Sequence, residues 1–138
     1  MRTYHGDIRK LLPHQIYVFG SNTQGRHGKG SALTAKQRFG AIQFKAYGPQ
    51  GQSYAIVTKD LTKQVHPSIS KFVIKMQIQK LYEYAVQNPQ LEFFIVYSGI
   101  GENLNNYSHV EMAQMFKTSA IPPNIIFRDT FAEIIKTC

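Results

Sequence analysis

The sequence lacks most features that tie a protein to an oxidising compartment or to a membrane. Its only cysteine is Cys138, so it can form no internal disulfide, and it contains no tryptophan. No stretch provides the ~20 consecutive apolar residues that a membrane-spanning helix needs. Residues 1–10 also lack the apolar segment of a secretory signal peptide. We therefore expect a cytoplasmic protein that does not contact a membrane.

Metal-ligand patterns are absent as well. The five histidines lie apart in the sequence, and no group of His, Asp, Glu or Cys has the spacing of a metal site. The lone cysteine gives no signal for a catalytic Cys/His pair. The sequence therefore predicts neither a bound metal nor a cofactor.

Acidic residues are scarce, and basic residues are numerous but dispersed. The chain has 16 Lys and Arg against 8 Asp and Glu, which gives a net charge of +8. This excess favours a polyanionic partner such as nucleic acid. No long basic run forms an arm, however, and no RNP, KH or helix-turn-helix pattern is present. A solvated basic surface explains the charge equally well, so a nucleic-acid-binding module stays an alternative.

Length and composition predict one globular domain spanning residues 1–138. A chain of this size buries about 68–70% of its unfolded surface. The content of 43% hydrophobic and 12% aromatic residues is that of a packed core and excludes a disordered chain. We find no internal repeat, linker or low-complexity tract. The oligomeric state cannot be predicted from these features.

The most informative segment is residues 15–40, where an apolar strand leads through a glycine-rich loop into a helix. The loop contains Gly20, Gly25, Gly28 and Gly30. Such a connection brings backbone N–H groups and a positive helix end close to an anion. The GxxGxG spacing matches neither the dinucleotide fingerprint nor a Walker A loop. We interpret it as a phosphate-ester site, with tight structural packing as the alternative; Arg26 and Lys29 add positive charge.

Strand and helix signals alternate along the chain. We expect strands at 15–19, 54–57, 91–97 and 124–127, and helices at 31–39, 67–88, 108–116 and 131–135. In the second helix the expected buried stripe is Ile69, Phe72, Val73, Met76, Leu81, Ala85 and Val86. Ser108 with Glu111 has the spacing of a capping box, and Gly48–Gly51 has turn chemistry. The alternation predicts an α/β fold with a largely parallel sheet.

Ligands of such sheets bind at the carboxyl ends of the strands. This rule brings together Asp7, Ser21-Asn22 with the glycine loop, Thr58-Lys59-Asp60 and residues 99–103. The group contains two glycine-rich turns, one lysine, three carboxylates and two asparagines. It suits an elongated phosphate ligand held between two loops.

Four pieces of the sequence, in order and over nearly the whole chain, resemble the macrodomain family of ADP-ribose-binding proteins. They are Gly6-Asp7-Ile8, Gly28 to Ala32 with Phe39-Gly40, Tyr54 to Lys59, and Gly99-Ile100-Gly101. The similarity is greatest to the branch of hydrolases that includes terminal ADP-ribose protein glycohydrolase and the antitoxin of a DNA-ADP-ribosylating toxin. The inserted Phe19 to Asn22 resembles uncharacterised, often phage-encoded relatives. The resemblance implies a three-layer α/β/α sandwich with a mixed, largely parallel sheet.

The resemblance also assigns roles to individual residues. It implies that Asp7 contacts adenine and that Lys59 is the catalytic lysine. Asn103 stands where some members of the branch have an aspartate, and an asparagine cannot act as a base. Glu102 and Asp60 are the neighbouring carboxylates. The predicted ligand-binding residues are Asp7, Ser21, Asn22, Gly25, His27, Gly28, Gly30, Ser31, Gly99, Ile100, Gly101, Glu102, Asn103 and Tyr107.

Three functions from different classes remain open at this point. The first is an enzyme that binds ADP-ribose or a related nucleotide and hydrolyses ADP-ribosyl adducts on DNA, RNA or protein, as Lys59 suggests. The second is a non-catalytic binder or sponge of ADP-ribose or a signalling nucleotide, which Asn103 favours. The third is the nucleic-acid-binding module, which the net charge favours.

Overall fold

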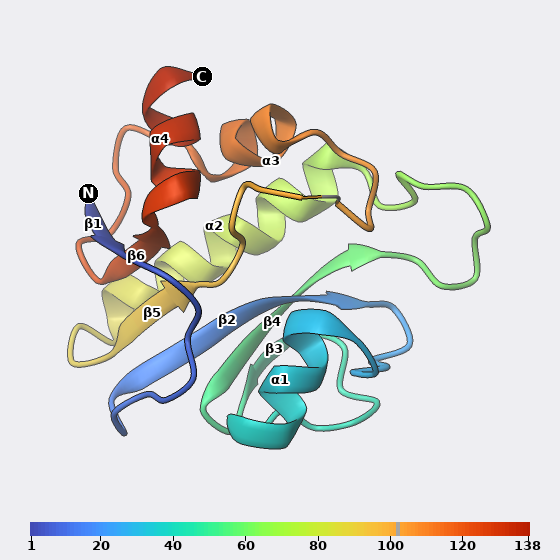
Figure 1. The fold of residues 1–138 in the computed structure, drawn as a ribbon, viewed down its shortest axis with the longest axis horizontal. Helices are drawn as coiled ribbons and strands as arrows, with labels where there is room; N and C mark the ends of the chain where they lie inside the picture. The colour runs from blue at the N-terminus through green and yellow to red at the C-terminus, as the bar shows by residue number, and fades with distance from the viewer. Residues whose placement is uncertain (102) are drawn as a thin grey trace.

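The computed structural model describes residues 1–101 and 103–138. Within these residues the chain forms a six-stranded sheet and four helices (Figure 1). In chain order the elements are β1 (Arg2–Tyr4), β2 (Gln15–Asn22), α1 (Gly30–Arg38), β3 (Gly48–Gln50), β4 (Ser53–Lys59), α2 (Lys71–Gln87), β5 (Glu92–Ile95), α3 (His109–Phe116), β6 (Ile125–Arg128) and α4 (Asp129–Thr137).

The sheet has the order β1-β6-β5-β2-β4-β3, and every neighbouring pair is parallel except β3 and β4. The predicted α/β class with a mixed, largely parallel sheet is therefore confirmed. The turn predicted at Gly48–Gly51 is wrong for most of its length, because Gly48–Gln50 is a short strand paired with β4. Pro49 is tolerated there because β3 is an edge strand, where one N–H needs no ladder partner.

Helices cover both faces of the sheet, which makes the fold a three-layer α/β/α sandwich (Figure 1). On one face, Ala32 and Ala35 of α1 pack with Tyr17 and Phe19 of β2. On the other face, α2, α3 and α4 share a larger core with the same sheet. The neighbouring strands β2 and β5 are therefore followed by helices on opposite faces of the sheet: α1 follows β2 on one face, and α3 follows β5 on the other.

Helix α2 buries a different stripe from the one predicted. Ile74, Ile78, Leu81, Tyr82 and Ala85 face the core. Of the expected stripe, Leu81 and Ala85 are buried, whereas Phe72, Val73, Met76 and Val86 are exposed. Both sets have helical spacing, and the packing against the sheet decides between them.

The helix that begins after Ser108 has the predicted ends and the predicted cap. Ser108 Oγ accepts a hydrogen bond from the Glu111 N–H at 3.0 Å, and a Glu111 carboxylate oxygen accepts one from the Ser108 N–H at 3.0 Å. The strand predicted at 91–97 ends earlier, at Ile95. Within the described residues, none of the helices combines the length and apolar character needed to cross a bilayer.

Candidate functional site

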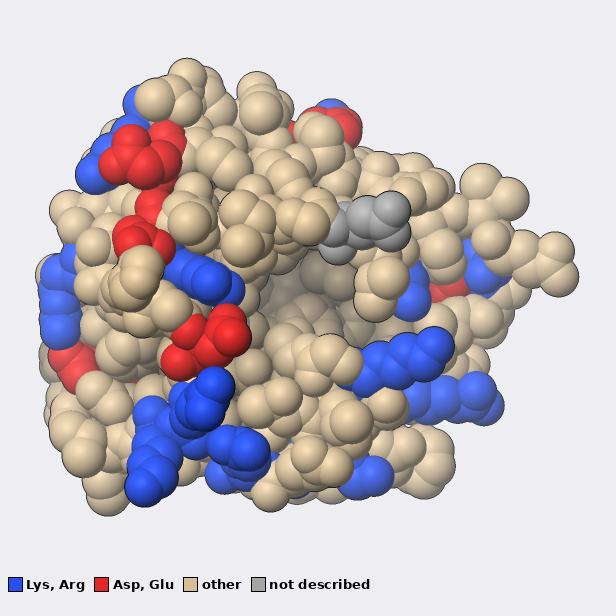
Figure 2. All heavy atoms as spheres, viewed as in Figure 1, with Lys and Arg blue, Asp and Glu red and all other residues tan. Residues whose placement is uncertain are grey.

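A cavity of about 690 Å³ opens at the carboxyl ends of β2, β4 and β5 (Figure 2). It lies where the chain leaves β2 toward one face of the sheet and leaves the adjacent β5 toward the other. In open α/β sheets this is where ligands bind, and the volume is within the usual range for small-molecule sites. The strand ends that the sequence analysis grouped together therefore surround a cavity in the structure.

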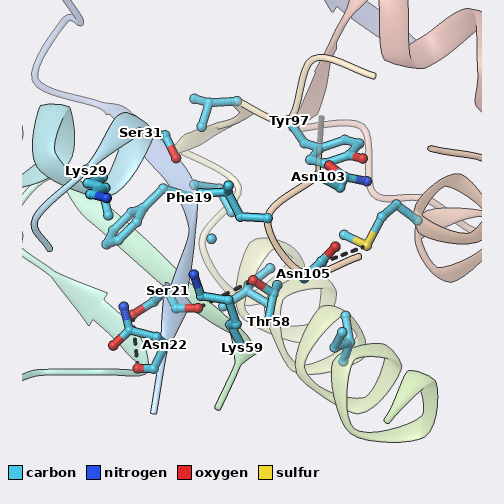
Figure 3. Close-up of a pocket in the computed structure, with 18 of the residues that line it drawn as sticks. Phe19, Ser21, Asn22, Lys29, Ser31, Thr58, Lys59, Tyr97, Asn103 and Asn105 are labelled. Carbon is cyan, nitrogen blue, oxygen red and sulfur yellow. Dashed lines mark hydrogen bonds between the residues drawn. The ribbon is translucent and has the colours of Figure 1, made fainter. Parts of the chain in front are cut away.

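Two segments form the sides of this cavity. We name residues 20–32 the β2 wall and residues 96–105 the β5 wall. Lining residues of the β2 wall are Gly20, Ser21, Asn22, Arg26, Gly28, Lys29, Ser31 and Ala32. Lining residues of the β5 wall are Val96, Tyr97, Ser98, Ile100, Asn103, Leu104 and Asn105. Figure 3 shows polar side chains from both walls and from β4 around one space.

The floor of the cavity is apolar. Val18 and Ile95 come from the sheet, Ile74 from α2, and Met112 and Phe116 from α3. All five belong to the larger core. A ligand that reached this depth would therefore place an apolar or aromatic part against the floor, and keep its polar groups near the rim.

The charges on the cavity lining have one sign. Arg26, Lys29 and Lys59 are the charged side chains among the described lining residues, and no described Asp, Glu or His lines the cavity. Three cations around a partly enclosed space attract an anion more strongly than the same charges in open water, because the effective dielectric is lower there.

A β-bulge turns two successive residues of β4 toward the cavity. Val57 pairs with Ser21 and Lys59 pairs with Asn22, so Thr58 has no partner in the ladder. In a regular strand neighbouring side chains point to opposite faces, whereas both Thr58 and Lys59 line the cavity here. Bulges often re-aim side chains in this way beside functional sites. The predicted Lys59 therefore lies in the cavity.

The first turn of α1 faces the cavity without a side-chain cap. Lys29 occupies the N-cap position, makes no side-chain capping hydrogen bond, and no acidic residue follows in the first turn. Ser31 and Ala32 of this turn line the cavity. The unpaired N–H groups and the positive end of the helix dipole are thus available to an anion.

The loop glycines divide into structural and cavity-facing positions. Gly25 does not line the cavity; with φ +62 its missing Cβ would lie 2.5 Å from the carbonyl carbon of Phe44. Gly28 lines the cavity, lacks a left-handed φ, and has nothing within 4 Å of a Cβ. Gly30, the first residue of α1, lies between two lining residues.

Asn22 holds the β2 wall in shape. Its Oδ1 accepts a hydrogen bond from the Arg26 N–H at 3.0 Å, and its Nδ2 donates to the Arg26 carbonyl at 2.9 Å. The neighbouring Ser21 is buried and also lines the cavity. Both predicted residues are thus at the cavity, but the Asn22 amide is already engaged with the loop.

His27 lies inside the protein and does not reach the cavity. Its ring is fully buried, with Nε2 at 3.1 Å from the Lys45 carbonyl and 3.2 Å from Gln50 Oε1. The ring also packs edge-on against Phe19. A histidine in a glycine loop was predicted to bind the ligand, but this one anchors the loop to residues 42–50.

The second glycine turn forms the upper part of the β5 wall. Ile100 and Asn103 line the cavity, whereas Gly99 and Gly101 do not. Gly99 has φ +74, a left-handed value that favours glycine, and a Cβ there would lie 3.2 Å from the backbone Cα of Phe131 in α4. Asn103 Nδ2 donates to the Tyr107 carbonyl at 2.7 Å. The predicted Glu102 lies outside the described residues.

Tyr97 and His109 lock the β5 wall to α3. His109 Nε2 is 2.8 Å from the Gly101 carbonyl, which can only accept, so Nε2 carries the proton. In this tautomer the Tyr97 hydroxyl donates to Nδ1 at 2.6 Å. Burial raises the pKa of Tyr97 to about 12, so its hydroxyl keeps that proton.

Three residues singled out in the sequence lie away from the cavity. The Asp7 carboxylate accepts a hydrogen bond from the Arg128 guanidinium at 3.2 Å. Tyr107 is buried, and its hydroxyl donates to the Ile69 carbonyl at 2.7 Å. Asp60 organises a turn by accepting from the Thr62 hydroxyl at 2.7 Å and the Thr62 N–H at 2.9 Å, contacts that lower its carboxyl pKa.

Asn105 is a lining residue that the sequence reasoning missed. The residue is 6% exposed, and among the described residues its Nδ2 donates only to the Met112 sulfur, at 3.4 Å. A thioether is a weak acceptor, so this amide retains donor capacity at the edge of the apolar floor (Figure 3). The three asparagines at 103, 105 and 106, shortly after a buried strand, were the signal that could have pointed to it.

Comparisons with known proteins give no name to this site. No family model matches the chain, and neither the curated proteins nor the solved structures contain a match. The macrodomain resemblance therefore rests on the sequence motifs alone and stays a prediction.

Proposed function

We propose that the cavity binds ADP-ribose or a closely related nucleotide. The observation that carries this proposal is the combination of three lining cations with the uncapped first turn of α1 in one cavity at the strand ends. A diphosphate is the kind of anion that such a helix start binds through backbone N–H groups. The apolar floor provides a surface for a flat ring, and amides provide hydrogen bonds to ribose hydroxyls.

The proposed arrangement places the diphosphate between the first turn of α1 and the Ser98 to Gly101 turn. Lys29 and Arg26 neutralise its charge from the β2 wall. The distal ribose lies toward Thr58 and Lys59, which the bulge of β4 turns into the cavity. Asp7 has no role in this arrangement, because its carboxylate pairs with Arg128 outside the lining.

Isothermal titration calorimetry with ADP-ribose, NAD and AMP tests the binding proposal. We expect ADP-ribose binding to weaken about tenfold, or ~1.4 kcal/mol, in Gly28→Leu, whose new side chain enters open space at the cavity. Lys29→Gln should weaken binding to a similar extent. Lys36→Gln is the matched control, because Lys36 lies in the last turn of the same helix, outside the lining. Equal ADP-ribose affinity in all four proteins would place the ligand elsewhere.

A second candidate function, hydrolysis of an ADP-ribosyl bond on nucleic acid or protein, is favoured by the position of Lys59. Its side chain lines the cavity beside the proposed distal ribose. There its ammonium can stabilise charge that develops as the bond to the anomeric carbon breaks. No described carboxylate lines the cavity to serve as a general base, so binding without turnover is the primary proposal.

Release of free ADP-ribose separates the two functions. ADP-ribosylated DNA and ADP-ribosylated protein are incubated separately with the parent protein and with Lys59→Ala. A hydrolase that depends on Lys59 releases ADP-ribose with the parent only. Tight binding of ADP-ribose without release from either substrate identifies a binder. Equal release by both proteins means that Lys59 takes no part in hydrolysis.

A further inference from the structure

The excess positive charge of this protein comes from one continuous segment. Residues 8–59 contain eight Lys and Arg and no Asp or Glu, while the other eight basic residues are balanced by all eight acidic ones. The segment forms β2, α1, β3 and β4, which are neighbours in space. Below the hollow in Figure 2, over the region that α1 occupies in Figure 1, the surface shows blue and no red. The basic residues that are dispersed in the sequence thus share one part of the fold.

A loop within this basic segment exposes large apolar side chains. Ile42, Phe44 and Tyr47 are 51%, 74% and 42% exposed. They follow α1, and the exposed Lys45 comes directly after Phe44. Aromatic side chains interleaved with cations are the usual platform for single-stranded nucleic acid, because bases stack on the rings while the cations contact the phosphates.

The backbone holds Phe44 outward at a conformational cost. Its φ is 71, a left-handed value that is rare for a bulky side chain. The Phe44 N–H donates to the Gly25 carbonyl at 2.8 Å, and the space of the missing Gly25 Cβ is filled by the Phe44 backbone. Since strained residues persist where the surrounding structure imposes them and cluster at functional sites, this exposed ring has the features of a contact residue.

The same loop is joined directly to the cavity rim. The buried ring of His27 bonds the Lys45 carbonyl and Gln50, and the Gln43 side chain accepts from the His27 N–H at 3.1 Å. Arg26, which lines the cavity, lies between Gly25 and His27, the two residues that hold this loop. A strand bound on the loop can therefore continue toward the cavity mouth.

We propose that residues 42–47, with Arg26, form a binding platform for single-stranded nucleic acid beside the cavity. Phe44 stacks on a base, and Lys45 and Arg26 contact the flanking phosphates; Tyr47 packs edge-on against Tyr54 and is not part of the stacking surface. An acidic protein segment would satisfy the cations, but it would leave the exposed ring of Phe44 without a flat partner. The platform does not depend on which nucleotide the cavity binds.

Fluorescence anisotropy with unmodified, labelled oligodeoxythymidine of about 20 nucleotides tests this proposal. We expect binding that weakens with salt, and a loss of at least about fivefold in affinity in Phe44→Ala. The matched control is Phe72→Ala: Phe72 is 70% exposed on α2, and the adjacent Lys71 is paired with Glu111 at 2.8 Å. This control should bind like the parent protein.

Further variants and ligands keep the test decisive. Phe44→Gly removes the ring and also relieves the left-handed strain. If this variant is as stable as the parent protein but binds the oligonucleotide more weakly, the loss supports stacking on the ring. Lys45→Gln should reduce the salt dependence of binding. The proposal is overturned if Phe44→Ala and Phe72→Ala bind equally, if duplex DNA or polyglutamate binds as tightly as the single strand, or if the parent protein does not bind the oligonucleotide.

Discussion

The two walls of the cavity are similar segments held in place by different interactions. Each is a loop that follows a parallel strand and contains glycines with positive φ. The β2 wall is fixed through backbone contacts, the Asn22 amide and the buried ring of His27, which leaves its cations free to face the cavity. The β5 wall is fixed by polar side chains, mainly its own Tyr97 and Asn103 together with His109 of α3, and its described lining residues carry no charge.

This difference suggests that the two walls would contribute differently to ligand recognition, one through charge and the other through shape. The β2 wall uses no long charged side chain to hold its shape, so under the proposed function it would select an anion by charge. A wall held by polar side chains has less charge to offer but a better defined shape, so under the same proposal the β5 wall would select by fit. Changes in the two walls should therefore have different consequences.

The largest effect is expected in the backbone packing of the β2 wall. Gly25→Ala places a Cβ 2.5 Å from the Phe44 carbonyl carbon at φ +62, whereas Gly28→Ala meets nothing within 4 Å. We expect Gly25→Ala to lower the free energy of unfolding by ~3 kcal/mol, because overpacking and left-handed strain add. Gly28→Ala should change it by less than about 0.5 kcal/mol. Urea denaturation measures both, and equal losses would contradict the division of the loop glycines.

The side-chain lock of the β5 wall should give a smaller loss. His109→Ala removes the acceptor of the Tyr97 hydroxyl and the donor to the Gly101 carbonyl. We expect a loss of ~1–2 kcal/mol in the free energy of unfolding. Tyr97→Phe removes one of the same bonds, so the double variant should cost less than the sum of the two single losses. Additive losses would show that the hydroxyl and the imidazole do not act as a pair.

A gain in stability is expected where the β2 wall meets its neighbouring loop. Phe44→Gly relieves a left-handed φ of 71 at an exposed side chain. The free energy of unfolding should rise by up to ~1 kcal/mol, because glycine adopts this conformation without the Cβ clash. Thermal unfolding checks the sign. A lower melting temperature would mean that the Phe44 ring contributes packing that outweighs its strain.

The smallest effect on stability is expected for Glu111 of α3, the helix that contacts the β5 wall, and it should appear only at acidic pH. A hydrogen bond from Lys71, joined by one from the Ser108 N–H, lowers the pKa of Glu111 from 4.5 to about 2. Because the folded pKa is depressed, this carboxylate stabilises the fold above about pH 4.5 and loses that effect as the pH falls toward 2. Melting temperatures of Glu111→Gln should therefore fall less between pH 5 and pH 2 than those of the parent. Parallel curves would contradict this role.

Local signals in the sequence were sufficient for much of the fold. The capping box at Ser108 and the alternation of apolar strands with helices depend on neighbouring residues, and the structure confirms them. The position of the cavity also followed from strand ends in a parallel sheet. In contrast, Gly48–Gln50 forms a strand because it pairs with β4. Which side of α2 is buried depends on how the helix packs against the core.

The residues of the site were harder to predict because exposure is a property of the whole fold. Ser21, Lys59 and Asn103 line the cavity as expected. His27 and Tyr107 have the chemistry of ligand contacts, yet both are buried with internal hydrogen-bond partners. Asn105 and the apolar floor come together only when α2 and α3 close over the sheet. No local pattern encodes that closure.

The pairing of the first strand with the last one constrains when this sheet can be completed. Residues 2–4 of β1 pair only with residues 126–128 of β6, whereas β2, α1, β3 and β4 come from one contiguous stretch of chain. During synthesis β1 can therefore pair with β6 only when nearly the entire chain has been made. The basic segment, residues 8–59, is available much earlier. The cavity also needs two separate parts of the chain, because its β2 wall belongs to this contiguous stretch and its β5 wall, with α3, follows later in the sequence.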